Sequence, residues 1–106
     1  MPKAHGKMSY RIEYSPVTIP HLRAMTARQR AAVWDAVDVQ LSHQPAVETR
    51  NRKPMRPNSL APWELRVEEC RVYYDVVEKP EQVVTVLAVG VKDRSRVIIG
   101  GEEIEL

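Results

Sequence analysis

Residues 71–91 read RVYYDVVEKPEQVVTVLAVGV, and the fold depends on this stretch. Two runs rich in β-branched residues, RVYYDVV and VVTVLAVGV, stand on either side of the polar segment EKPEQ, a pattern typical of a β-hairpin. The second run is almost wholly apolar, as expected of a central strand that is covered on both faces. We therefore expect an antiparallel strand pair at the centre of a sheet.

Further strands are predicted on both sides of this hairpin. Trp63, Leu65 and Val67 alternate with charged residues, which indicates a half-buried strand directly before the hairpin. The same period of two appears near the N-terminus at residues 10–14. Residues 96–99 predict a short edge strand after the hairpin.

Two helices are predicted between the first strand and the others. The segment TARQ at residues 26–29 fits a capping box, and it opens a helix that runs to about Ser42 with an inward face formed by Ala27, Ala31, Trp34, Val37 and Leu41. Pro20 interrupts the segment before it. We therefore expect a turn from Pro16 and a short helix over residues 20–25 whose inward residues are Ile19, Leu22 and Met25.

This order of elements predicts an α+β domain, with an N-terminal strand and two helices packed on an antiparallel sheet of about four strands. A chain of 106 residues has the size of one domain, so residues 1–106 are expected to form a single one. We expect disorder in residues 1–8 and an acidic tail in residues 100–106. No apolar run approaches the ~20 residues of a membrane span, and the start lacks the apolar centre of a secretory signal. A cytoplasmic location without a membrane partner is therefore expected.

Basic residues concentrate in the first half of the chain. Residues 1–56 contain ten Lys and Arg against four acidic residues, whereas residues 57–106 contain six against ten. Such asymmetry indicates an anionic partner. The densest group lies in ETRNRKPMRPN, residues 48–58. A charge run of this kind is most often a solvated loop; here we expect Arg50, Arg52, Lys53 and Arg56 to bind phosphates. One cysteine and three scattered histidines argue against a metal site, and no cofactor is expected.

A second set of cations lies near the ends of the predicted strands, at Arg66, Arg71, Lys92, Arg94 and Arg96. If the last strands are antiparallel neighbours, Arg71 at the start of one lies beside Lys92 at the end of the next. Arginine pairs two phosphate oxygens and stays charged, so the set predicts a phosphate-binding surface. The nearest acid–base candidates are Lys92, Tyr73, His43 and Glu64. Each residue alone is also compatible with an ordinary structural role.

The segment LRVEECRVYYDV, followed by a turn and VVTVLAVGVKDRS, resembles the C-terminal strands of the RelE/ParE superfamily, the toxins of prokaryotic type II toxin–antitoxin systems. The N-terminal YRIEYSP and the helical pair after it match the same pattern, so the resemblance covers residues 10–96. It implies a curved antiparallel sheet that carries two N-terminal helices on one face. It also implies a small antitoxin protein that binds and silences the toxin.

The resemblance implies two alternative activities. A RelE-like toxin inhibits translation by cleaving mRNA on the ribosome without a metal; Arg71 then matches the arginine that stabilises the transferring phosphate, and Lys92 and Arg94 match the basic pair after VG. Arg66, Arg96 and the loop cations would bind the RNA. The chain departs from that branch at Trp63 and Glu64, where lysines are expected, and near Ile98, where a catalytic tyrosine is expected.

These departures keep a non-enzymatic member open: a ParE-like inhibitor of DNA gyrase, or a degenerate toxin that only binds its antitoxin. A plain RNA-binding domain is a third alternative, although the chain has no Phe and few adjacent aromatic residues. The ending GGEEIEL is expected to be an exposed solubilising tail. The alternative hypothesis is that its glutamates fold over the basic surface and compete with an anionic ligand.

Overall fold

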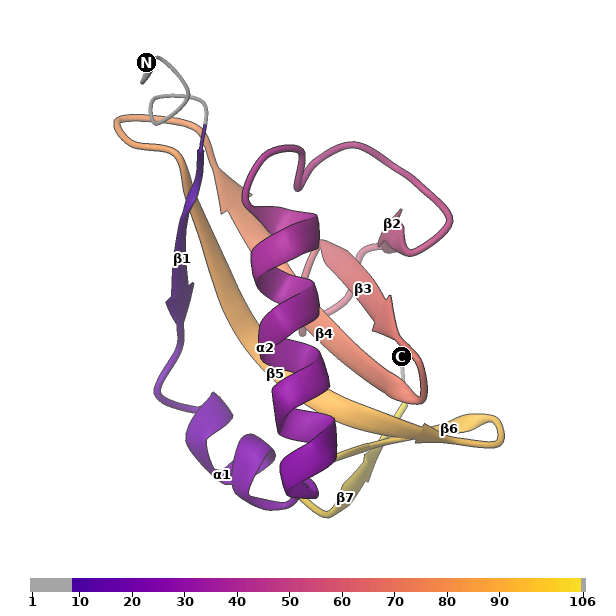
Figure 1. The fold of residues 1–106 in the computed structure, drawn as a ribbon. Coiled ribbons are helices and arrows are strands. Elements are labelled where there is room, and N and C mark those ends of the chain that lie inside the picture. Colours follow the sequence, from indigo (N-terminus) through magenta and orange to yellow (C-terminus); the bar gives the residue numbers. More distant parts are fainter. Residues whose placement is uncertain (1–8, 106) are drawn as a thin grey trace.

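The computed structural model describes residues 9–105 and has the predicted α+β class (Figure 1). The predicted disorder falls on residues 1–8, which lie outside the described residues. Two helices and seven strands follow one another as β1 (Arg11–Tyr14), α1 (Thr18–Arg23), α2 (Ala27–Leu41), β2 (Arg52–Pro54), β3 (Trp63–Val67), β4 (Cys70–Val77), β5 (Val83–Asp93), β6 (Arg96–Ile99) and β7 (Glu102–Ile104). The expectation of about four sheet strands was too low, because two short strands lay in segments interpreted as loop and tail.

Strands β2 to β7 are neighbours in sequence order and pair antiparallel, whereas β1 pairs with β5 in parallel. The central hairpin is confirmed, since β4 pairs along β5 from Val77 opposite Val83 to Cys70 opposite Val91. Because β4 occupies one edge of β5, β1 and β6 share the other. β1 pairs with residues 83–86 of β5, and β6 pairs with residues 90–93 of β5.

The acidic tail forms the strand β7. Gly100 and Gly101 have φ angles of 60° and 85°, and they form a two-residue turn in which Ile99 pairs with Glu102. Two successive residues with positive φ are the requirement of a type I′ hairpin, which glycine meets without strain. The glutamates of the tail are exposed, as expected, but the tail has a structure that was not predicted, because Glu102 and Glu103 stand on the edge strand of the sheet.

Helix α2 begins at the predicted capping box, where the Gln29 amide donates to Thr26 Oγ1 at 3.1 Å and the Thr26 amide donates to Gln29 Oε1 at 2.9 Å. Its buried stripe is Val33, Val37 and Leu41. Trp34 was expected to be a core anchor, and this prediction was wrong because its side chain is 47% exposed. The predicted stripe through Trp34 and the observed stripe through Val33 both contain Val37 and Leu41, so residue spacing alone did not determine the rotation of the helix.

Helix α1 begins two residues before the predicted start. Pro20 lies in its first turn, where backbone amides have no partner within the helix, so the missing N–H of proline costs nothing there. Ile19 is exposed, contrary to expectation, and Thr18 is buried in its place. Met25 is buried, as predicted.

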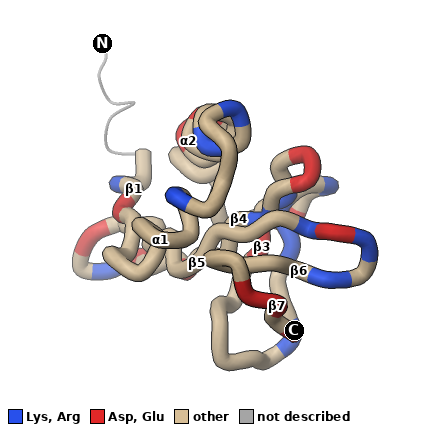
Figure 2. Tube along the Cα trace, turned by 90° about the horizontal axis from the view of Figure 1, so that it is seen from below, with Lys and Arg blue, Asp and Glu red and all other residues tan. Residues whose placement is uncertain are grey.

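The sheet is covered on both faces. The helices lie over one face (Figures 1 and 2), and between helices and sheet lies the larger core cluster, which includes Val37, Leu65 and Tyr74. On the opposite face, a smaller cluster joins Tyr73, Ala88, Ala61 and Ile99. We call this opposite side the far face. No helix of the described residues is long and apolar enough to cross a membrane.

His21 fills a gap in the sheet. Between the parts of β5 that pair with β1 and with β6, the amide of Val89 donates to Nδ1 of His21 at 3.3 Å. A side chain on α1 thus supplies the acceptor that a neighbouring strand would otherwise provide. Burial lowers the pKa of His21, which agrees with an unprotonated Nδ1 that can accept.

We predict that His21 makes the fold less stable at mildly acidic pH. Its folded pKa lies below the ordinary value of about 6.5, so the unfolded chain binds the proton first. The free energy of unfolding should therefore be fully retained above pH 6.5 and fall as the pH decreases through the folded pKa. Urea denaturation at a series of pH values measures this dependence. The variant His21→Gln should lose it, whereas His43→Gln, at an exposed position after α2, should keep it; equal pH profiles for all three proteins would contradict the assignment.

Candidate functional site: a cationic sheet face

Four cations of strands β2 to β5 occupy the far face because of strand register. Lys53 lies opposite Glu64, which lies opposite Tyr73 in the far-face cluster. Side chains alternate between faces with a period of two, so residues two positions from these pairs share their face. The far-face cations, as we call them, are Lys53, Arg66, Arg71 and Lys92.

Arg66 and Arg71 are direct cross-strand partners on β3 and β4. Like charges placed directly opposite destabilise a sheet, and neither arginine has an ion-pair partner among the described residues. Two neighbouring guanidinium groups without a carboxylate are an arrangement that an external anion would relieve. This pair is therefore the centre of the candidate site.

Arg71 is held rigidly. Its side chain is only 8% exposed, and Nη1 donates to the carbonyls of Glu68 and Cys70, both at 2.8 Å. Within the described residues, its Nε and Nη2 groups make no hydrogen bond, yet they are not sealed from solvent. One part of the guanidinium is thus fixed by the β3–β4 turn, and the other part remains available to a ligand.

Lys92 follows the predicted geometry. Gly90 lies opposite Arg71, and Lys92 is two residues further along β5 on the same face. The Lys92 amide donates to the carbonyl of Glu69 at 2.7 Å, which ties this end of β5 to the β3–β4 turn. The hairpin therefore brings Arg71 and Lys92 to the same end of the sheet, as expected. Their catalytic roles stay predictions.

Arg52 differs from the other cations of the 48–58 stretch. It lies opposite Leu65 on the helix side of the sheet and is 8% exposed. Its Nε donates to the Val47 carbonyl at 3.1 Å, and Nη1 donates to the carbonyl of Gln40 in the last turn of α2. This guanidinium satisfies one carbonyl that the helix end leaves without a partner, at Gln40, and one carbonyl of the following loop, at Val47. Its position is that of an internal anchor, and we leave Arg52 out of the candidate site.

The other predicted cations lie outside the set of far-face cations. Arg50 and Arg56 are exposed on the segments before and after β2. Arg94 stands in the β5–β6 turn with a φ of 60°. Arg96 pairs with Asp93 at 3.5 Å and with Glu103 of β7 at 3.2 Å, so the acidic tail neutralises this one arginine. Alternation places Arg96 on the face opposite to Lys92.

Acid–base groups near the far face are few. The side chain of Tyr73 is fully buried, and its pKa is raised by burial and by the neighbouring carboxylate of Glu64. Burial also raises the pKa of Cys70 to about 11, which keeps the thiol protonated at neutral pH. His21 lies with α1 in the sheet gap. Among residues 9–105, no group of three His, Cys, Asp or Glu side chains is placed to hold a metal.

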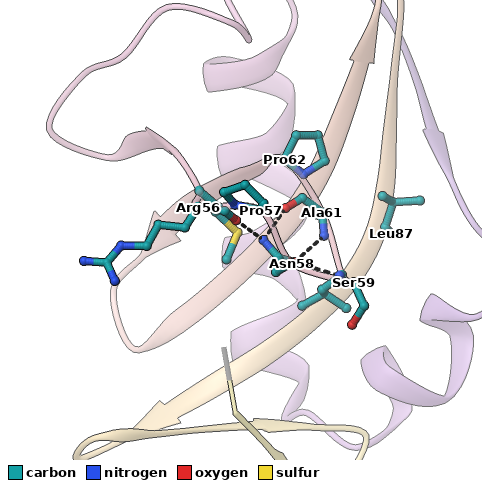
Figure 3. Close-up of a pocket in the computed structure, with 9 residues that line it drawn as sticks. Arg56, Pro57, Asn58, Ser59, Ala61, Pro62 and Leu87 are labelled. Atoms are coloured by element: carbon teal, nitrogen blue, oxygen red, sulfur yellow. Dashed lines mark hydrogen bonds between the residues drawn. The ribbon is translucent and has the colours of Figure 1, made fainter.

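A shallow pocket of about 460 Å³ borders the far face (Figure 3). Residues 55–62 and Leu87 line it. Asn58 shapes this loop: its Nδ2 donates to the carbonyls of Arg56 and Ala61 at 2.6 and 2.9 Å, and its Oδ1 accepts from the Leu60 and Ala61 amides at 2.7 and 2.9 Å. The Arg56 side chain extends outward from the loop (Figure 3).

Comparison with protein-family models found no match for this chain, and no curated protein matches it either. The case for the far face as a site therefore depends on its own geometry and on the sequence pattern.

Sequence reasoning found all four far-face cations but missed the buried role of Arg52. The sequence contained little indication of which face Arg52 points to, because β2 has only three residues and shows no clear alternation of apolar and polar residues. The Asn58 loop was also missed, although an asparagine after proline is a frequent turn signal.

We predict that Arg52 and Lys53, adjacent in sequence, respond oppositely to substitution. Arg52→Met should reduce the free energy of unfolding by about 2–3 kcal/mol, because the partly buried carbonyls of Val47 and Gln40 lose a charged donor. Lys53→Met should change it by less than about 0.5 kcal/mol, since Lys53 is exposed. Urea denaturation measures both. Similar stabilities of the two variants would show that Arg52 is not an anchor.

Proposed function

We propose that this protein is the toxin of a type II toxin–antitoxin pair, similar to RelE, and that it inhibits translation by binding mRNA through the far face. The observation that supports this most is the direct cross-strand pair Arg66 and Arg71, without a carboxylate partner in the described residues and with Lys53 and Lys92 on the same face. Four cations on one small sheet suit a phosphate backbone.

Single-stranded RNA fits this surface better than duplex DNA. The cations are spread over adjacent strands of a sheet, and among the described residues no helix carries them into a groove. A flexible strand can follow such a surface and place successive phosphates on successive cations. The ribosome would present mRNA in this single-stranded form, and the protein would act in the cytoplasm.

The proposed chemistry at the scissile phosphate is charge stabilisation. Arg71 is fixed by two carbonyls and keeps N–H groups free, which is the preorganisation that stabilises developing negative charge. Lys92 and Arg94 would add charge at the same end of the sheet. Glu64 lies on the far face opposite Tyr73 and is the carboxylate placed to act as a base there. An endoribonuclease of this type needs no metal or cofactor.

A small antitoxin protein is the proposed partner of the helical side. Trp34 and Val39 on α2 and Val17 and Ile19 on or beside α1 are large apolar residues that are about half exposed or more. Exposed aromatic and aliphatic side chains of this kind are frequent in protein interfaces. This apolar surface lies on the opposite side of the sheet from the far-face cations. A partner that binds there would leave the RNA-binding face open. We propose that a second, acidic segment of the antitoxin covers that face.

The salt dependence of RNA binding tests the far face. Each phosphate contact to a single strand adds about 0.7 to the negative slope of log affinity against log salt. The double variant Lys53→Gln/Arg66→Gln should therefore make the slope less negative by about 1.4. Fluorescence anisotropy with a short single-stranded RNA measures it.

The matched control is Arg23→Gln/Arg28→Gln, which removes the same charge from exposed positions on the helical side. It should leave the slope nearly unchanged. If both double variants reduce the slope equally, the far face is not the binding surface.

Expression in a bacterium tests the biological activity. Induction of the wild-type chain should arrest growth and yield mRNA ends in phase with codons, whereas Arg71→Gln should relieve the arrest. Growth measurements with mapping of mRNA ends and of DNA breaks distinguish the alternatives. Double-strand breaks that depend on gyrase would instead indicate a ParE-like inhibitor, and normal growth would contradict a toxin.

A further inference from the structure

The pocket formed by the loop of residues 55–62 is held in shape by the loop itself (Figure 3). The Met55 amide donates to the Pro62 carbonyl at 2.8 Å, which joins the two ends of the loop. The side chain of Asn58 bonds four backbone groups within it. Three prolines in or beside the loop fix further backbone angles. A loop restrained in this way loses little conformational entropy when a ligand binds.

The lining of the pocket combines apolar side chains with a single charge. Met55, Leu60 and Leu87 are partly buried and pack against the far-face cluster. Of the nine lining residues, Arg56 is the one that carries a charge. Its side chain extends outward (Figure 3) and has no ion-pair partner among the described residues. A largely apolar ligand with a negative charge beside it suits this lining.

The pocket adjoins one end of the row of far-face cations. Lys92, Arg71, Arg66 and Lys53 stand on the neighbouring strands β5, β4, β3 and β2. The loop begins directly after β2, so Met55 follows Lys53 by two residues and lies on the same face of the sheet. A single strand whose phosphates follow the cations therefore brings a base to the pocket.

We propose that this pocket binds one base of a single-stranded RNA whose phosphates lie on the far-face cations. The inference rests on the proposed function, to which it adds a contact with the base. The base packs on Met55, Leu60 and Leu87, and the planar guanidinium of Arg56 stacks on it, as arginine does on unpaired bases. An apolar side chain of a protein partner would leave the charges of Arg56 and of the cation row without a counterpart. Charge complementarity thus favours the nucleotide.

Three small ligands separate the base from the phosphate. Adenosine 5′-monophosphate, cytidine 5′-monophosphate and ribose 5-phosphate carry the same phosphate group, and the last of them lacks a base. NMR titration of the full chain gives each affinity, and the ratio of a nucleotide's affinity to that of ribose 5-phosphate cancels the phosphate contribution. This ratio should be about five or more for at least one nucleotide, the lower end of what one stacked base contributes.

Arg56→Gln and Arg50→Gln form a matched pair of variants. Both remove one exposed charge from the same basic stretch, but Arg50 does not line the pocket. Arg56→Gln should lower the affinity ratio about two- to fivefold, as expected for the loss of a cation stacked on a ring. Arg50→Gln should leave the ratio unchanged.

Asn58→Ala tests the shape of the pocket without a change in charge. The loop loses the four hydrogen bonds of the Asn58 side chain, so the affinity ratio should fall towards one. Circular dichroism checks that this variant folds, and the comparison of Arg56→Gln with Arg50→Gln decides the question if it does not.

Several outcomes would overturn the proposal. These are a ratio of one for both nucleotides, an equal decrease of the ratio in Arg56→Gln and Arg50→Gln, and pocket resonances that shift with N-acetyl-leucine amide but not with nucleotides, which would indicate a site for a protein side chain. RNA binding that depends on Arg66, with a ratio of one, would leave the proposed function standing without a base pocket. A high ratio in a chain that neither arrests growth nor yields mRNA ends would support the pocket and contradict the toxin.

Discussion

The pairing of β4 with β5 is the constraint on which the rest of the structure depends. Successive residues of a strand point to opposite faces, so Tyr73 and Tyr74 each become the largest fully buried side chain on their own side of the sheet. The register shifts between these two tyrosines, and Leu87 is the extra residue on β5. As a result, Leu87 packs with Ala88 in the far-face cluster and lines the pocket. A sheet with two buried faces follows from this one strand pair.

Covering both faces has a consequence for charge. The helices bury the part of this face at β2, where Arg52 satisfies the carbonyls of Val47 and Gln40. The far face is covered only by a loop and by the β6–β7 hairpin, so Lys53, Arg66, Arg71 and Lys92 can gather there. The separation of an anchoring arginine from the far-face cations thus depends on strand parity and not on composition.

The sequence was sufficient for the elements with clear periodicity and strong signals. The β4–β5 hairpin, the capping box at Thr26 and the convergence of Arg71 with Lys92 could all be predicted, because each follows from local rules of turns, caps and alternation. The rotation of α2 could not, since Val33 and Trp34 both fit a stripe through Val37 and Leu41. Strands β2 and β7 have three residues each and exist only through pairing with a neighbour. A local sequence pattern does not predict such tertiary effects.

The far face contains two groups that are unfavourable for the stability of the fold. Arg66 opposite Arg71 is unfavourable within a sheet, and the Tyr73 hydroxyl is unfavourable within a core. The fold tolerates both because Tyr73 packs against Ala61, Ala88 and Ile99 and because the turn carbonyls hold Arg71. Arg71 and Tyr73 thus carry two local costs two residues apart on β4. An anion bound beside Arg66 and Arg71 would remove the first cost, which is why the geometry of this pair favours a ligand of negative charge.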